Sequence, residues 1–302
     1  MNMPFRGRAH LVERAVEAMG DSQSHVLSAP PAGQAEAASA TGLPPAGPAP
    51  APAATPGLVK PVISLDLMIA AGLVPAPPGR QRNRVVEEVS VVQQQVLRAA
   101  EDGSARNRIV LVTSARPGEG KTFMALNLAA CMAANGTRKV VLIDTDGKRG
   151  SITEALKVGD ADGLRGLVAG PQGQVGLPLV QTAIRNLMFL PFGRAVVAAQ
   201  QVPPANLMAD AIARIARLLP DHVLVLDTPP SLSSSDANAL SSVAGQVLMV
   251  VDAERTQRNE VEAALDMIDA CPLLQLVLNR VSMSANDRFG AYGDYGAPPD
   301  AN

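Results

Sequence analysis

A glycine-rich stretch, TSARPGEGKTF at residues 113–123, carries the residue types best suited to holding a phosphate. The stretch follows a short apolar run. Its residues can be compared with the pattern of a phosphate-binding loop, which is G-x-x-x-x-G-K-[ST]. Ala115, Gly120, Lys121 and Thr122 occupy the fixed positions, with alanine in place of the first glycine. Small residues let successive backbone N–H groups turn inward around a phosphate, and the positive end of the following helix points at it. The stretch therefore predicts a phosphate loop.

The side chains of this loop suit ATP and Mg²⁺ as cofactors. Lys121 would reach the β- and γ-phosphates, and Thr122 would offer its hydroxyl to Mg²⁺. A glycine turn before an ordinary helix is the alternative interpretation, which the strand, loop and helix context disfavours. The predicted nucleotide-binding residues of the loop are Pro117, Gly118, Glu119, Gly120, Lys121, Thr122 and Phe123.

Three aspartates follow apolar runs and complete the candidate site. In IDTDGKRGS, Asp144 and Asp146 are two residues apart, so in an extended segment they would point to the same side and face the phosphates together. In VLVLDTPPS, Asp227 ends a Walker B type of strand. An aspartate at a strand end is often only a turn residue, but the phosphate loop upstream favours a metal role. The predicted Mg²⁺ ligands are Thr122, Asp144 and Asp227.

Six short apolar runs are predicted strands and must position these residues. They alternate with segments of helical periodicity, and most are continuously apolar, as expected for a parallel sheet covered on both faces. We predict an α/β domain over residues 81–283, with a doubly wound, mostly parallel sheet of the P-loop NTPase type. Ligands bind beyond the carboxyl ends of such strands. The predicted strands are 109–114, 140–146, 187–192, 223–228, 246–253 and 274–281.

The rest of the chain is predicted to surround this domain without a core of its own. Residues 1–28 contain a short amphipathic helix, and residues 29–80 form a Pro/Ala-rich disordered linker with a short helix in ISLDLMIAAG at 63–72. Residues 284–302 form a flexible, glycine-rich tail.

Composition excludes several classes of protein. The net charge of −2 gives no field to attract nucleic acid. Cys131 and Cys271 lack the spacing of a zinc site, which predicts free thiols in a reducing compartment. The sequence shows neither a signal peptide nor an apolar run of the roughly 20 residues that a membrane span needs. We therefore expect a cytoplasmic protein without its own transmembrane segment.

The motifs ARPGEGKT, VLIDTD and VLVLDTPP, with a tail that holds both tyrosines of the chain, resemble the bacterial tyrosine kinases of polysaccharide export. The resemblance is closest to the exosortase (PEP-CTERM)-associated tyrosine autokinases, and extends to LVERAVEAM, SLDLMIAAGLV, FLPFGR and SSVAGQVLMVVDAERT. It covers most of the chain outside the Pro/Ala spacer. It implies autophosphorylation on tyrosine with MgATP and a role in exopolysaccharide or capsule biosynthesis and export.

The resemblance also implies roles for single residues. The implied catalytic residues are Lys121, Asp144, Asp146 and Asp227, with Asp146 favoured as the base that accepts the tyrosine proton. Asn279 and Arg280 match the position where related ATPases contact adenine. The implied phosphoacceptors are Tyr292 and Tyr295, on a tail that cannot pack. Incidental tyrosines in a disordered terminus are the alternative, and transfer within one chain or between chains remains open.

The family implies an inner-membrane chain-length determinant protein as partner, peripheral attachment to that membrane through it, and a homo-oligomer. Three features depart from the family pattern. Glu87, Ser90 and Gln93 stand where a Glu-x-x-Arg-x-x-Arg stretch supports ring assembly, Gly150 stands where proline is common, and two tyrosines make a sparse cluster.

Two other functions remain open from the sequence. A partitioning or positioning ATPase shares the fold, but its phosphate loop usually carries a lysine where this chain has Arg116 and Pro117. The other alternative is a nucleotide-binding scaffold with decayed kinase activity. ATP hydrolysis without labelled tyrosine would favour the first, and binding without turnover would favour the second.

Overall fold

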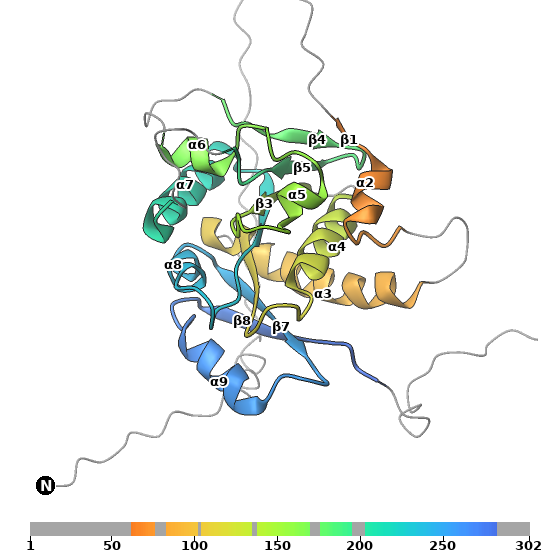
Figure 1. Ribbon diagram of the computed structural model, residues 1–302, viewed down its shortest axis with the longest axis vertical. Helices are drawn as coiled ribbons and strands as arrows, with labels where there is room; N and C mark the ends of the chain where they lie inside the picture. The colour runs from red at the N-terminus through yellow and green to blue at the C-terminus, as the bar shows by residue number, and fades with distance from the viewer. Residues whose placement is uncertain are drawn as a thin grey trace, which may run out of the picture. The chain divides into compact units, whose positions relative to one another are not determined.

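A mostly parallel sheet, covered by helices on both faces, forms the core of the chain (Figure 1). The computed structural model describes residues 62–75, 83–101, 104–134, 138–169, 176–194 and 203–282. Its strands are β1 (Val62–Ile63), β2 (Ile109–Ser114), β3 (Lys139–Asp144), β4 (Val180–Thr182), β5 (Leu187–Leu190), β6 (His222–Asp227), β7 (Gln246–Asp252) and β8 (Leu273–Asn279). Its helices are α2 (Leu65–Ala70), α3 (Arg84–Glu101), the 3-10 helix η1 (Ala105–Arg108), α4 (Lys121–Ala134), α5 (Ile152–Ala155), α6 (Leu164–Ala169), α7 (Ala205–Leu218), α8 (Asp236–Ser241) and α9 (Arg258–Asp266).

The strand order places the predicted phosphate loop at the middle of the sheet. The order is β1-β4-β5-β3-β6-β2-β7-β8, so β2 pairs with β6 on one side and β7 on the other. Strands β5, β3, β6, β2, β7 and β8 are mutually parallel, whereas the short β4 runs antiparallel to β5. The carboxyl ends of the parallel strands therefore meet at one edge, and the predicted fold is confirmed.

Alternate residues of the interior strands pack into two apolar cores, one on each face of the sheet. Val110 and Val112 of β2 pack with α2, α3, α4 and α5 on one face of the sheet. Ile109 and Leu111 pack with α6, α7, α8 and α9 on the other. Because every residue of β2 is buried, its first four residues are all apolar and show no alternating pattern in the sequence.

The sheet also includes a segment that the sequence analysis assigned to the linker. Val62 and Ile63 pair with Gln181 and Thr182, which makes β1 the edge strand next to β4. Residues 62–75 thus belong to the same folded body, and Ile63, Met68 and Leu73 are buried in its core. The short helix predicted within residues 63–72 corresponds to α2. The pairing of β1 with the sheet was not predicted, because two strand residues make too short a pattern to separate from the proline-rich sequence around them.

Several of the predictions from sequence fall outside the described residues. These are the amphipathic helix within residues 1–28, most of the Pro/Ala-rich linker, and the tail with Tyr292 and Tyr295. Within the described ranges, no helix has both the length and the apolar character needed to cross a membrane.

Candidate active site

The predicted phosphate loop joins the end of β2 to the start of α4, which begins at Lys121. Gly118 and Gly120 have φ angles of 84° and 100°, a left-handed conformation that glycine adopts without steric cost. Ala115 is fully buried in the core, so the position that departs from the motif lies at the base of the loop and is filled by a methyl group. The loop therefore has the strand, loop and helix setting that the motif requires.

Lys121 lies at the centre of the site between two carboxylates. Its Nζ is 3.1 Å from Oδ2 of Asp146 and 3.9 Å from Oδ1 of Asp227. The Lys121 side chain is only 12% exposed, so water screens these ion pairs weakly. The start of α4, the loop after β3 and the end of β6 thus place one ammonium and two carboxylates within contact distance.

Asp227 ends β6 and is almost fully buried. Its Oδ1 accepts a hydrogen bond of 3.2 Å from the Thr122 hydroxyl. Burial raises the pKa of Asp227 to about 7, and the nearby ammonium of Lys121 opposes this rise. The hydroxyl and the carboxylate predicted to serve Mg²⁺ are therefore adjacent.

Asp144 and Asp146 do not form the parallel pair that an extended segment would give. Strand β3 ends at Asp144, and the chain turns there because the Asp144 carboxylate accepts from the backbone N–H groups of Asp146, at 3.0 Å, and Gly147, at 3.4 Å. Its other oxygen accepts from the backbone N–H of Thr153 at 3.1 Å. Asp144 therefore shapes the loop that carries Asp146, and its predicted contact with Mg²⁺ stays a prediction.

Asp146 carries the free carboxylate oxygen of the site. Its Oδ2 accepts from Lys121, whereas its buried Oδ1 has no hydrogen-bond partner among the described residues. The ammonium of Lys148 lies 3.8 Å from Oδ1. A buried carboxylate oxygen without a donor is costly, so a hydroxyl or a bound cation would satisfy it.

The residues predicted to contact adenine lie beside the phosphate loop and already have protein partners. Asn279 ends β8, and its Nδ2 donates to the backbone oxygen of Glu119 at 2.9 Å. Arg280 donates from NH1 to Oδ2 of Asp252 at 2.6 Å. Burial alone would raise the pKa of Asp252, but the hydrogen bond from Arg280 contributes to a net pKa below the ordinary value. Their contact with adenine stays a prediction.

The remaining loop residues differ in their surroundings. Pro117 and Gly118 are exposed, and the ring of Phe123 lies next to Gly72, 3.6 Å from where a Cβ at that glycine would stand. Arg116 is exposed and forms an ion pair of 3.1 Å with Glu260 of α9.

Asp252 and Thr256 were not among the predicted site residues, and Glu119 was predicted as a nucleotide-binding residue of the loop. The Glu119 side chain is buried and accepts hydrogen bonds from the backbone N–H of Asp252 and from the Thr256 hydroxyl. An apolar run that ends in aspartate, as in QVLMVVD, is the signal that could have found Asp252, because Asp144 and Asp227 stand in the same position of their strands.

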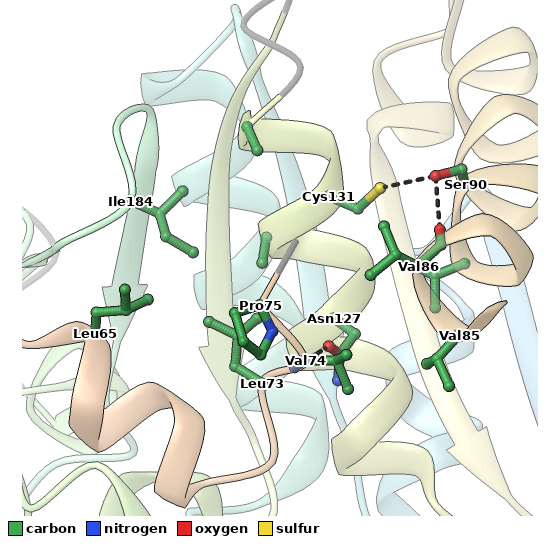
Figure 2. Close-up of a pocket in the computed structure, with 13 residues that line it drawn as sticks. Leu65, Leu73, Val74, Pro75, Val85, Val86, Ser90, Asn127, Cys131 and Ile184 are labelled. Carbon is green, nitrogen blue, oxygen red and sulfur yellow. Dashed lines mark hydrogen bonds between the residues drawn. The ribbon is translucent and has the colours of Figure 1, made fainter. Parts of the chain in front are cut away.

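The positions that depart from the family's ring motif lie on α3, away from this site. Gln93 is buried, and its Oε1 accepts from the Cys131 thiol of α4 at 3.0 Å, while Ser90 lies 3.5 Å from the same sulfur. Ser90 and Cys131 also line a mostly apolar cavity of about 320 Å³ between α3, α4 and residues 73–75 (Figure 2). Both cysteines of the chain are free thiols and half-buried.

Comparisons with known proteins agree with this geometry. A family model described as an AAA domain matches residues 107–280, more than half of the chain. Tyrosine-protein kinase CpsD of Streptococcus agalactiae is 32% identical over 196 residues, which cover 63% of this chain and 81% of CpsD. Tyrosine-protein kinase wzc of Salmonella typhimurium is 32% identical over 199 residues, which cover 64% of this chain but only 26% of that relative.

The solved structure of the kinase domain of Escherichia coli tyrosine kinase ETK has the same fold, with a TM-score of 0.55 at 24% identity over 76% of this chain and 94% of that domain. The sequence relatives confirm the resemblance to bacterial tyrosine kinases, while the exosortase-associated subtype stays a prediction. The chain belongs to the AAA-domain family and, within it, to the bacterial tyrosine-protein kinases.

Proposed function

We propose that the chain is an ATP-dependent protein-tyrosine autokinase that phosphorylates Tyr292 and Tyr295 of its C-terminal tail. The observation that carries the proposal is the convergence of Lys121, Asp146 and Asp227 at the start of α4, with one Asp146 oxygen left without a donor. Membership of a kinase family supports the binding of a nucleotide at this site. The site offers a loop that can bind phosphate and a carboxylate oxygen that can accept a proton.

The chain's own groups would hold ATP as follows. Loop amides and the start of α4 would bind the phosphates, and Lys121 would exchange its carboxylate partners for phosphate oxygens. Within the described residues, no group of three or more acidic, histidine or cysteine side chains could hold a metal ion. Thr122 and Asp227 fit an ion that arrives with the nucleotide, since phosphate oxygens and water complete its coordination. Mg²⁺ held there would neutralise the charge on the phosphates during transfer.

Asp146 would serve as the base. Its free Oδ1 would accept the proton of a tyrosine hydroxyl as the phenolic oxygen attacks the γ-phosphorus. The bond between the γ-phosphorus and the bridging oxygen breaks, ADP leaves, and phosphotyrosine is formed. Asp144 would act indirectly, because it fixes the turn from which Asp146 projects.

We further propose that the kinase regulates assembly or export of an extracellular polysaccharide from the cytoplasmic side of the inner membrane. The motifs shared with kinases of polysaccharide export support this role. By the same resemblance, the partner would be an inner-membrane chain-length determinant protein, and the kinase would work as a homo-oligomer.

The test is incubation of the purified chain with MgATP, alone and with candidate partner peptides, followed by mass spectrometry of phosphotyrosine. Wild type should carry phosphate on Tyr292 or Tyr295, and Lys121→Ala should carry none. Lys139→Ala is the matched control, because it removes an exposed lysine at the opposite end of β3. Tyrosines that stay unmodified while ATP is hydrolysed would make the chain a switch ATPase, and nucleotide binding without turnover would make it a scaffold.

A further inference from the structure

Glu119 is a carboxylate inside the phosphate loop that is only 3% exposed. Its Oε2 accepts from the backbone N–H of Arg116 at 2.6 Å, within the loop itself. Its Oε1 accepts from the backbone N–H of Asp252 at 3.3 Å and from the hydroxyl of Thr256. Asp252 ends β7 and Thr256 precedes α9, so one carboxylate joins the phosphate loop to the connection between these elements.

A second set of contacts comes from the end of β8. The side chain of Asn279 fills the space next to Gly120, where an added Cβ would lie 2.2 Å from Nδ2, and it donates to the Glu119 backbone. Arg280 binds the buried Asp252 carboxylate at 2.6 Å with its own backbone at a φ of 58°, which is uncommon for a residue with a side chain. The two residues that lead into the tail therefore contact the loop directly and through Asp252.

These contacts decide which loop amides are free to face a phosphate. The N–H of Arg116 is already taken by Glu119, and Pro117 has none, so the free amides of the loop begin at Gly118. The same contacts hold the Glu119 carboxylate against the connection between β7 and α9. A carboxylate released from these donors would repel a phosphate bound in the loop.

We propose that Glu119 is the positioning residue of the phosphate loop, and that Asp252 and Arg280 couple it to the start of the C-terminal tail. Nucleotide affinity then depends on how the end of β8 is held. This inference rests on nucleotide binding at the loop and does not require that the tail be phosphorylated, so its failure is distinct from failure of the kinase assay.

The first test is the affinity of the full chain for a fluorescent ADP analogue. Thr256→Val keeps the shape of the side chain but removes the donor to Glu119, and should weaken binding about ten-fold. Thr256→Ser restores the hydroxyl and should bind within about two-fold of wild type. Glu260→Gln, which breaks the partly exposed ion pair with Arg116, should also stay within about two-fold. Wild-type affinity in Thr256→Val, or an equal loss in Thr256→Ser, would overturn the role of Glu119.

The second test is a double-mutant cycle between Glu119→Gln and Arg280→Gln, read by the same affinity. A glutamine at 119 must turn an N–H toward one of the former donors, so this variant should lose about ten-fold or more. If Arg280 acts through Asp252 and Glu119, the double variant loses clearly less than the product of the two single losses. Multiplicative losses would mean that Arg280 acts on the nucleotide independently, and the coupling would be refuted.

Discussion

Asp227 is buried at the end of β6 beside Lys121, and these surroundings determine the pKa of its carboxyl group. Burial raises its pKa from 3.8 to about 7, so the folded state keeps a proton that the unfolded chain loses at lower pH. Because the folded state binds more protons in this window, the free energy of unfolding falls as pH rises from about 4 to about 7.

We expect Asp227→Asn to remove this dependence. Thermal unfolding of the nucleotide-free protein should show the variant becoming more stable than wild type between pH 4 and pH 7, by at most about 4 kcal/mol. Asp269→Asn changes an exposed aspartate and serves as the control, with no such trend. A difference between Asp227→Asn and wild type that stays constant across this pH range would contradict the prediction.

Because Asp144 and Asp146 have different surroundings, we expect substitution of Asp146 to slow phosphorylation and substitution of Asp144 to lower stability. Asp146→Asn should retain nucleotide binding but slow tyrosine phosphorylation by about 100-fold or more, because it removes the proton acceptor. Asp144→Asn should lower the unfolding free energy by about 1–3 kcal/mol, because an amide cannot accept from all three backbone N–H groups around it. Phosphotyrosine yield, nucleotide affinity and unfolding midpoints separate the two variants. Equal stability losses in both would refute the structural role of Asp144.

Helix α3 buries Gln93, one of the positions at which the resemblance implies an arginine. Gln93 is buried and accepts from Cys131 of α4, so an arginine there would place a guanidinium between two packed helices. We expect Gln93→Arg to lower the unfolding free energy by about 3 kcal/mol, measured by denaturant unfolding. Gln94→Arg, on the exposed side of the same helix, should be within about 0.5 kcal/mol of wild type. A stable Gln93→Arg protein would show that α3 can turn away from α4.

Sequence patterns located most of the strands, including the edge strand β8, and missed the short strands β1 and β4 at the opposite side of the sheet. The predicted strand 109–114 coincides with β2. The bounds of four further predicted strands lie within about two residues of β3, β6, β7 and β8; these are 140–146, 223–228, 246–253 and 274–281. Interior strands such as β6 and β7 are nearly continuous apolar runs because both of their faces are covered. β1 and β4 have two and three residues, so their pairing depends on tertiary contacts and leaves no periodic pattern.

The candidate site was predictable where it depends on neighbours in sequence, as at Lys121 and Thr122. It was less predictable where contacts join distant segments. Glu119 is 137 residues from Thr256, and no local pattern indicates that its side chain would turn toward that hydroxyl. The turn at Asp144 was missed for a related reason. The Asp144 carboxylate accepts hydrogen bonds from the backbone N–H groups of Asp146 and Thr153, which lie on either side of a bend.

At the scale of the whole molecule, residues 62–75 pack into the core of the folded domain. Met68 of α2 is 1% exposed in the core that also contains α3 and α4. We expect Met68→Ala to lower the unfolding free energy by about 3 kcal/mol. Ile69→Ala, whose side chain is 41% exposed, should cost under about 1 kcal/mol. Calorimetry of both variants checks this, and equal effects would mean that α2 contributes little to the core.

Lys121 lies between the carboxyl groups of Asp146 and Asp227. Binding of MgATP is then an exchange of counter-ions, in which phosphate oxygens replace Asp146 and Asp227 around one ammonium. Such an exchange leaves the number of ion pairs in the buried site almost unchanged. We expect the affinity for MgATP to vary only weakly with added salt, unlike that of a phosphate site built from solvent-exposed lysines, for which dissolved ions compete at every step.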